Sequence, residues 1–221
     1  MDQWAEIKGL IRNENIELGP YFGHQVRNSP RHLLFTYARY KFAQKMIPQD
    51  NPLEILELGC SEGLGSLMLA EPGHKVTGID ADDEAVGHAK KTIENDRITF
   101  KSCNFLGGEF GSFDAVVSMD VIEHIDLADE QAYMDTVTKN LKPRGIAVIG
   151  TPNDTATQYA SKASQIGHVN MFEASRFREL LDKNFHNTFL FSMNDEIVHT
   201  GFYPMAHYLI GLCCAPRAAV Q

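Results

Sequence analysis

The sequence predicts an α/β fold in which a mostly parallel sheet carries helices on both faces. Two observations lead to this prediction: short apolar runs alternate with helical patterns, and a glycine-rich turn follows the first of those runs. The chain has 221 residues, enough for one domain with a substantial core and a small appendage. We expect a helical cap or lid over residues 1–50, a core over residues 51–193 and a C-terminal strand or helix cap over residues 194–221.

The N-terminal segment is expected to begin with a helix and continue as a loop. Residues 2–12 place their apolar side chains on one side of a short amphipathic helix. Residues 13–28 contain Gly19, Pro20 and Gly23, which usually interrupt regular structure. This stretch is therefore predicted to be a loop.

A longer helix is predicted after Ser29, which is a good capping residue, with Pro30 in its first turn. Its basic side chains are predicted to form a solvated face. The alternative is a lid that closes over a substrate. The apolar side chains at helical spacing are Leu33, Leu34, Tyr37, Ala38 and Met46. The residues that a lid would present are Tyr21, Arg27, Arg31, Tyr37 and Arg39.

From residue 53 onward, strands and helices alternate, which predicts βαβ units and a parallel sheet. The predicted strands lie near residues 53–58, 75–80, 98–101, 113–119, 146–150 and 188–193. The predicted helices lie near residues 63–70, 83–95, 128–141 and 174–184. In the tail, the apolar piece from residue 205 to residue 214 is predicted to be a helix or a lid.

One stretch organises the chain: a buried strand, a glycine-rich turn and the start of a helix. Ile55 and Leu56 begin the apolar run of a central parallel strand. Gly59 permits a sharp turn because it has no Cβ to clash at positive φ, and Gly63 would let a ligand approach the backbone. Free N–H groups at the following helix start favour a polar or anionic ligand group. Asp80 ends the next strand, where a carboxylate can bind ribose hydroxyls.

These motifs resemble, in the right order, those of the class I S-adenosylmethionine (SAM) methyltransferases. Glu57, the glycine turn and Asp80 resemble the family's first motif and the acidic motif that follows it. Residues 113–120 resemble its fourth strand, and residues 141–150 resemble its L-K-P-G-G turn and fifth strand. The resemblance implies a Rossmann-like class I methyltransferase with a seven-stranded, mostly parallel sheet whose last strand is antiparallel. A nicotinamide dehydrogenase is the nearest rival, but its G-x-G-x-x-G pattern is not matched by residues 59–65.

The resemblance implies SAM as the cofactor. Asp80 would bind the ribose, and Ala81 would lie along the adenine. Asn104 stands where the family usually has Asp and would hydrogen-bond the adenine edge, while Phe105 would stack on the base. Ser61 replaces a common glycine, and its small size should preserve the pocket. The expected cofactor-binding residues are Glu57, Gly59, Ser61, Gly63, Asp80, Ala81, Asn104, Phe105 and Asp120.

A group of acids and histidines follows the fourth and fifth strands. Asp120, Glu123 and His124 would share one face of a helix at the carboxyl ends of the strands, where open α/β sheets bind ligands. With a T-P-N loop at residues 151–153 and the later His168, they resemble two metal-assisted groups, the small-RNA 2′-O-methyltransferases and the ubiquinone-pathway O-methyltransferases. The resemblance implies that Asp120, Glu123, His124 and His168 bind a divalent ion that holds the acceptor hydroxyl.

Mixed carboxylate and imidazole ligands suit Mn²⁺ or Fe²⁺ better than Mg²⁺, although Mg²⁺ is abundant. A metal-free site is an equal alternative. There, His124 or His168 would be the general base, because imidazole titrates near neutral pH, and Asp120 would contact the cofactor. The predicted catalytic residues are therefore His124, His168 and Asp120 in either case.

Composition restricts the class of partner. The net charge of −9 and the lack of a basic run argue against a nucleic-acid surface. No apolar run approaches the roughly 18 residues of a membrane span. The first residues lack the apolar core of a secretory signal, and the four cysteines lack C-x-x-C spacing, which predicts a cytoplasmic protein with free thiols. We expect methyl transfer to an oxygen of a small polar metabolite, sugar or nucleotide-linked precursor.

Two alternatives stay open. One is an RNA-terminal ribose 2′-O-methyltransferase, which the metal-type motif suggests. The other is a non-catalytic SAM-binding regulatory subunit, against which the acid-and-histidine face argues. No N-P-P-Y-type tetrapeptide follows the fourth strand, so methylation of DNA base amino groups is not expected. The sequence leaves the acceptor and the oligomeric state open.

Overall fold

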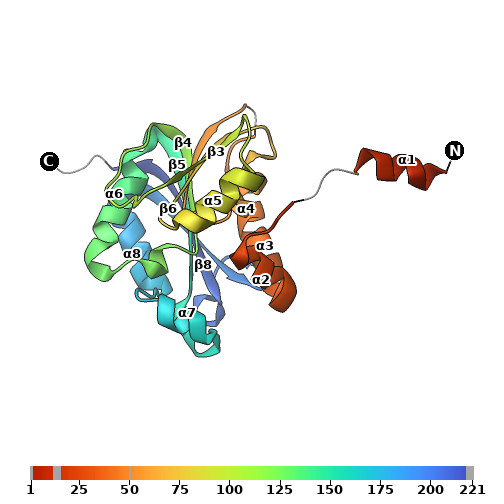
Figure 1. Ribbon diagram of the computed structural model, residues 1–221. Coiled ribbons are helices and arrows are strands. Elements are labelled where there is room, and N and C mark those ends of the chain that lie inside the picture. Colours follow the sequence, from red (N-terminus) through yellow and green to blue (C-terminus); the bar gives the residue numbers. More distant parts are fainter. Residues whose placement is uncertain (1, 12–15, 50, 218–221) are drawn as a thin grey trace.

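An eight-stranded sheet forms the centre of the computed structural model, which describes residues 2–11, 16–49 and 51–217 (Figure 1). Its strand order is β3-β2-β1-β4-β5-β8-β6-β7. The strands are β1 (Glu54–Leu58), β2 (Lys75–Asp80), β3 (Ile98–Ser102), β4 (Phe113–Met119), β5 (Leu141–Pro152), β6 (Phe185–Asn194), β7 (Ile197–His199) and β8 (Tyr208–Pro216). The first five strands pair in parallel, which confirms the predicted α/β fold.

The C-terminal part of the sheet is antiparallel. Strand β8 lies between β5 and β6 and runs antiparallel to both. The prediction of a helix or lid at residues 205–214 was therefore wrong for most of that piece. Both faces of β8 are covered at Leu209 and Ile210, and a strand buried on both faces has a continuous apolar run instead of an alternating one. The short strand β7, at the edge of the sheet, forms a hairpin with β6 and was not predicted.

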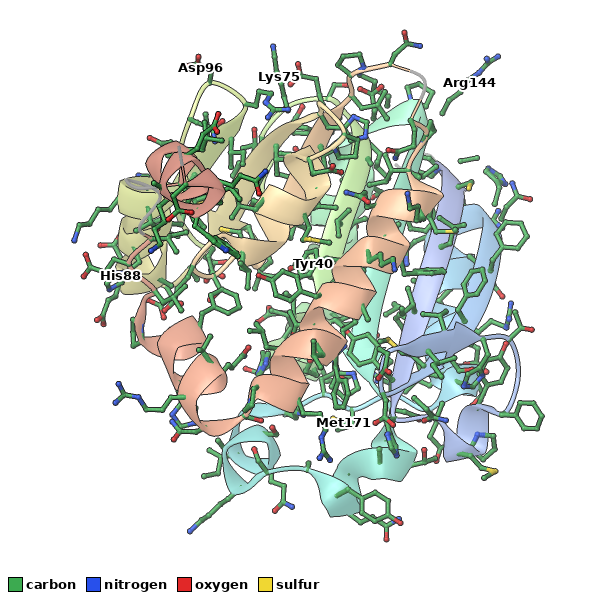
Figure 2. All side chains as sticks on the ribbon, turned by 90° about the vertical axis from the view of Figure 1, so that its right-hand side faces the viewer. Tyr40, Lys75, His88, Asp96, Arg144 and Met171 are labelled. Atoms are coloured by element: carbon green, nitrogen blue, oxygen red, sulfur yellow. The ribbon has the colours of Figure 1, made fainter. Side chains whose placement is uncertain are left out.

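Helices cover both faces of the sheet. One apolar cluster joins one face of the sheet to α3 (Pro30–Met46), α4 (Leu64–Ala70) and α5 (Asp83–Thr92). The other cluster joins the opposite face to α6 (Glu130–Lys139) and α8 (Ala174–Asn184). Figure 2 shows α3 lying across the sheet, with Tyr40 near its middle. None of the described helices combines the length and the apolar character that crossing a membrane requires.

The predicted loop at residues 13–28 was confirmed at residues 16–19, which form no helix or strand, and was wrong from residue 20 onward. Residues 20–28 form helix α2 (Pro20–Asn28), with Gly19 as its N-cap and Pro20 at its first position. Proline is favoured at that position because the N–H that it lacks would have no partner inside the helix. The Gly-Pro pair therefore begins a helix here. Residues 13–15 of the predicted loop, and residue 12 at the end of the predicted first helix, lie outside the described residues.

The other two N-terminal helices were predicted, but which of their residues are buried was not. Helix α1 (Gln3–Leu10) buries none of its residues. Helix α3 begins after Ser29, whose side chain makes no capping hydrogen bond. The buried residues of α3 are Arg39, Tyr40, Ala43 and Gln44. The predicted solvated face was thus wrong at Arg39, which is only 8% exposed.

Candidate active site

The glycine-rich turn after β1 is shaped by its backbone. Gly59, Ser61 and Gly63 all have positive φ, at 79°, 47° and 84°. A Cβ on Gly59 would lie 2.1 Å from a methyl carbon of Val121, so only glycine fits there. The N–H of Ser61 donates to Oδ2 of Asp80 at 2.8 Å. Strain at Ser61 is therefore offset by a charge-assisted hydrogen bond from the end of the neighbouring strand.

Asp80 also positions the adjacent loops. Its Oδ1 accepts from the N–H of Asp82 at 2.9 Å, and its carbonyl accepts from the N–H of Cys103 at 2.9 Å. Ala81 is exposed beside it. Asn104 is exposed as well, and its Oδ1 accepts from the N–H of Leu106 at 3.0 Å. The turn, the acid and the amide that the sequence singled out thus lie around one end of the sheet, with Nδ2 of Asn104 left to donate.

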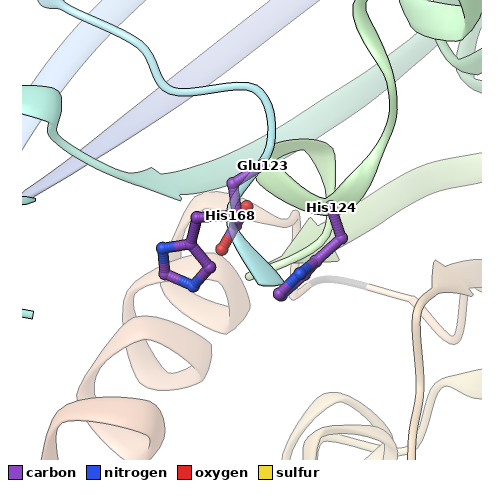
Figure 3. Close-up of side chains that lie close together, drawn as sticks. All are labelled: Glu123, His124 and His168. Atoms are coloured by element: carbon purple, nitrogen blue, oxygen red, sulfur yellow. The ribbon is translucent and has the colours of Figure 1, made fainter. Parts of the chain in front are cut away.

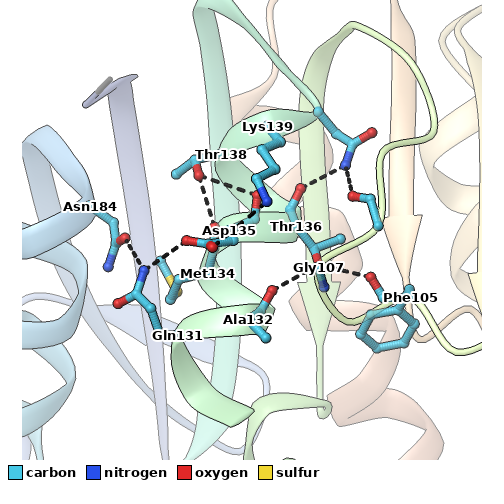
Figure 4. A network of polar contacts seen from close by, with 12 residues as sticks. Phe105, Gly107, Gln131, Ala132, Met134, Asp135, Thr136, Thr138, Lys139 and Asn184 are labelled. Carbon is cyan, nitrogen blue, oxygen red and sulfur yellow. Dashed lines mark hydrogen bonds and ion pairs between the residues drawn. The ribbon is translucent and has the colours of Figure 1, made fainter. Parts of the chain in front are cut away.

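Phe105 lies apart from this arrangement. Its ring is 6% exposed and belongs to the core cluster beneath α6, so the predicted stacking on adenine is replaced by a core role. The hydroxyl of Thr136 donates to the carbonyl of Phe105 at 2.8 Å and accepts from the N–H of Gly107 at 2.7 Å (Figure 4). These bonds hold the loop after β3 against α6.

Glu57 is completely buried at the end of β1. The hydroxyl of Ser66 in α4 donates to its Oε2. Burial raises the pKa of Glu57 to about 7, although the hydroxyls of Ser66 and Tyr40 favour the charged form. Glu57 thus lies in the strand that leads into the glycine-rich turn, with a pKa raised into the neutral range.

A second cluster lies at the carboxyl ends of β4 and β5 and consists of Glu123, His124 and His168 (Figure 3). One ligand atom from each residue lies within 4.8 Å of the others. Glu123 and His124 come from a short 3₁₀-helix, η1 (Ile122–His124), in place of the predicted α-helix. His168 follows helix α7 (Lys162–Gly167). The structure thus brings together three of the four predicted metal ligands.

Glu123 is the buried member of this cluster. Its Oε2 accepts from the hydroxyl of Thr151 at 3.1 Å, whereas its buried Oε1 has no hydrogen-bond partner among the described residues. Burial raises the pKa of Glu123 well above its ordinary value. The N–H groups of Val169 and Asn170 donate to the carbonyl of Glu123 at 2.8 and 3.0 Å, which brings His168 beside it. An unsatisfied carboxylate oxygen next to two imidazoles fits the donor set of a divalent ion.

The two histidines are arranged so that each has a free nitrogen. Their ring centroids are 5.0 Å apart. Nδ1 of His124 lies 2.8 Å from the carbonyl oxygen of Gly167, which can only accept, so Nδ1 carries the proton and Nε2 keeps its lone pair. Burial lowers the pKa of His168, and the nearby His124 adds to this effect. A neutral imidazole is the form that binds a metal or accepts a proton.

A polar network supports the loop that carries His168. Nδ2 of Asn170 donates to Oε2 of Glu130 at 3.1 Å, and Arg176 donates to Oδ1 of Asn170 at 2.8 Å. Arg176 also pairs with Glu130, and its guanidinium lies 3.9 Å from the ring centre of Phe172. The sequence interpretation missed this network because its members come from α6, α8 and the loop between β5 and α8.

Asp120 lies close enough that its charge, after burial, contributes to the raised pKa of Glu123 and opposes the lowering of the pKa of His168, but its carboxylate is paired with Arg39 of α3. Both of its oxygens accept from Nη1 of Arg39, at 2.7 and 2.6 Å. The guanidinium of Arg39 stacks on the ring of Tyr208 at 3.8 Å, and the N–H of Asp120 donates to the hydroxyl of Tyr208 at 3.2 Å. In this arrangement Asp120 is the counter-ion of Arg39, and the predicted metal-ligand role is not met. Its φ of 59° turns its side chain toward α3.

Polar side chains in and around the C-terminal tail make hydrogen bonds within the protein. Ser192 contacts Nδ1 of His199 at 2.8 Å, and the hydroxyl of Tyr203 donates to the carbonyl of Leu190 at 3.0 Å. Asn153 of the T-P-N loop donates to the carbonyls of Tyr203 and Ala206. These residues hold the segment between β7 and β8 in place.

A family model described as a methyltransferase domain matches residues 22–185, well over half of the chain. The ubiquinone biosynthesis O-methyltransferase of Rickettsia akari is 33% identical over 111 residues, which cover 49% of this chain and 43% of that protein. The mitochondrial ubiquinone biosynthesis O-methyltransferase of Arabidopsis thaliana is 35% identical over 115 residues, which cover 49% of this chain and 35% of that protein. The chain thus spans less than half the length of these curated relatives.

Solved structures share the fold. A chain from the complex of the Haloferax volcanii Trm112 methyltransferase activator with a methyltransferase has a TM-score of 0.69 and 17% identity, covering 91% of this chain and 100% of that chain. The N-methyltransferase NodS of Bradyrhizobium japonicum, bound to S-adenosylhomocysteine, has a TM-score of 0.63 and 20% identity. The match covers 83% of this chain and 88% of NodS. At these identities the likeness concerns the fold.

Proposed function

The chain belongs to the class I SAM-dependent methyltransferases, and from that membership we propose that it methylates an oxygen of a small polar metabolite, sugar or nucleotide-linked precursor with the help of a divalent ion. The residues proposed to hold the ion are Glu123, His124 and His168. We further propose that α2 and α3, together with the segment after β6, cap the acceptor side of the core.

One observation supports this proposal above all others: the cluster of a buried carboxylate and two imidazoles beside the cofactor end of the sheet. The free oxygen of Glu123 has no partner among the described residues, and burying such an atom is costly unless a ligand satisfies it. Hydroxyl acceptors need activation, because an alcohol is a poor nucleophile at neutral pH. A divalent ion held by these residues would lower the pKa of the acceptor hydroxyl.

The chain's own residues would supply positioning. Asp80 and Asn104 would orient the adenosine, and the turn from Gly59 to Gly63 would hold the methionine end close to η1. The ligand cluster would then hold the acceptor oxygen in line with the methyl group. Holding two reactants in this geometry accounts for a large part of such a rate enhancement, up to about 7–11 kcal/mol of the barrier.

A metal-free route is the second candidate, and the state of His168 favours it. Burial keeps its imidazole neutral near pH 7, as a general base requires. In this route His168 takes the proton of the acceptor hydroxyl while the acceptor oxygen attacks the methyl group. The two routes make different predictions for metal binding.

The test is a calorimetric titration of Mn²⁺ into chelator-stripped protein loaded with S-adenosylhomocysteine. We expect one binding site that is lost in Glu123→Ala and in His168→Ala. His186→Ala is the matched control, because His186 is exposed on β6. If the wild-type protein binds no Mn²⁺, the metal-assisted route is wrong. The pH dependence of methyl transfer in His168→Gln then tests the general-base route.

A further inference from the structure

Helix α2 is capped by Glu62, which lies in the glycine-rich turn of residues 59–63, called the cofactor turn below. Its own N-cap, Gly19, has no side chain to accept the free N–H groups of the first turn. The carboxylate of Glu62 takes that role: Oε1 accepts from the N–H of Tyr21 at 2.8 Å, and Oε2 accepts from the N–H of Phe22 at 2.9 Å. Glu62 is only 3% exposed, so these are sheltered, charge-assisted hydrogen bonds.

Glu62 has no freedom to move independently of the turn. It stands between Ser61 and Gly63, both of which have positive φ. The N–H of Gly63 donates to the carbonyl of Cys60 at 2.9 Å, which closes the turn beneath it. A Cβ on Gly19 would lie 2.2 Å from Oε1 of Glu62, so the start of α2 is in close contact with the carboxylate. The position of α2 is therefore set by the same turn that would hold the methionine end of SAM.

A third hydrogen bond ties α2 to the other end of the cofactor site. The hydroxyl of Tyr21 donates to Oδ2 of Asp82 at 2.8 Å. Asp82 lies two residues after Asp80, the acid proposed to bind the ribose, and its N–H donates to Oδ1 of that acid. An exposed ion pair between Glu17 and Lys91 adds a third attachment, to α5, at 2.6 Å. The first turn of α2 thus bridges the loop after β1 and the loop after β2.

The far end of α2 leads to the acceptor side. Ser29 separates α2 from α3, and α3 carries Arg39, whose guanidinium pairs with Asp120 at the end of β4. One continuous segment, α2 and α3, is therefore attached to the cofactor loops at its start and to the acceptor end of the sheet at its middle.

We propose that α2 is a cofactor lid latched by two positioning residues, Glu62 and Tyr21. The cofactor enters and leaves when the two N–H bonds to Glu62 and the phenol bond to Asp82 break together. Helix α3 stays packed in the core when the lid opens, so the movement is confined to α2 and the residues before it. The proposal needs only the cofactor site and is independent of the acceptor and of any metal.

The test measures release of S-adenosylhomocysteine and protection of α2 in the same variants. Protein loaded with tritiated S-adenosylhomocysteine is chased with an excess of the unlabelled compound. Hydrogen–deuterium exchange reports on the amides of residues 19–28. We expect Glu62→Gln and Tyr21→Phe each to release the ligand about tenfold faster, as the loss of one net hydrogen bond implies, and to lose protection in α2. Glu109→Gln, an exposed carboxylate elsewhere, should leave both readouts unchanged.

The outcomes separate a lid from a simple brace. If α2 loses protection but the release rate stays at the wild-type value, Glu62 only stabilises the helix and the lid proposal is wrong. Tyr21 is 53% exposed, so Tyr21→Phe keeps the test valid if Glu62→Gln fails to fold. Failure of the wild-type protein to bind S-adenosylhomocysteine would overturn the cofactor site itself, whereas equal release rates with normal binding would overturn the lid alone.

Discussion

The two ends of the candidate active site are built in different ways. The cofactor end depends on backbone conformation: three positive φ angles lie within five residues, and Asp80 accepts a backbone N–H from the turn. The acceptor end depends on side chains from distant segments: Arg39 reaches Asp120, and Thr151 reaches Glu123. The cofactor end should therefore be sensitive to added atoms, and the acceptor end to lost partners.

The largest effect is expected from Gly59→Ala, which adds one carbon to the cofactor turn. The new Cβ would meet Val121 at 2.1 Å, and φ of 79° is unfavourable for alanine. We expect a loss of about 2–6 kcal/mol in the free energy of unfolding, from backbone strain and overpacking together. Chemical denaturation and S-adenosylhomocysteine affinity measure it. Gly87→Ala, in an open position on α5, should instead stabilise the protein slightly, and equal behaviour of the two variants would contradict the steric explanation.

The cofactor turn and the alternating strands could be predicted because their signals are local. A glycine turn between a buried strand and a helix occupies about ten consecutive residues, and Asp80 ends the next strand in the chain. The seven-stranded class I methyltransferase sheet was confirmed apart from the added hairpin strand β7. Helix α2 was missed because Gly-Pro has two readings, a break or a start, and only the partner Glu62 decides between them.

The acceptor end could be predicted only in part. The resemblance to metal-assisted enzymes predicted Glu123, His124 and His168 as ligands, and the structure places them in one cluster. The role of Asp120 could not be predicted, because its partner Arg39 lies 81 residues earlier in the chain. The support of His168 by Asn170 was missed for the same reason. Long-range side-chain pairs leave no periodic pattern in a sequence.

Glu57 offers a second way to distinguish the two ends, through pH. The folded protein keeps the proton of Glu57 up to a pKa of about 7, whereas the unfolded chain loses it near 4.5. Between these values the folded state binds more protons, so the free energy of unfolding falls as pH rises from about 5 to about 8, by roughly 3 kcal/mol. Glu57→Gln should remove its share of this slope, leave the part that comes from Glu123, and be the more stable protein at pH 8. An unchanged slope in urea titrations at several pH values would show that another group is responsible.

Breaking the Arg39–Asp120 pair tests the acceptor end. Arg39→Met should cost about 2–3 kcal/mol, below the value for a fully buried pair because the Asp120 side chain is 33% exposed. Arg39→Met combined with Asp120→Asn should cost less than the sum of the single changes. Urea denaturation of all four proteins measures the coupling, and strict additivity would mean that the pair contributes nothing. Asp120→Asn removes a charge that acts on Glu123 and His168 but no proposed ligand, so Mn²⁺ affinity should change less than in Glu123→Ala.

The smallest effect, and the one that separates the two ends most cleanly, comes from two asparagines. Asn170→Ala removes the bonds to Glu130 and Arg176 that hold the His168 loop, so Mn²⁺ affinity should fall about 10–100-fold while S-adenosylhomocysteine affinity is unchanged. Asn104→Ala, at the cofactor end, should weaken S-adenosylhomocysteine binding and leave Mn²⁺ affinity unchanged. Calorimetric titration of each ligand into each variant gives four affinities. If either variant lowered the affinity for both ligands equally, the two ends would act as one cooperative unit. The difference between a backbone-built cofactor end and a side-chain-built acceptor end would then have no effect on binding.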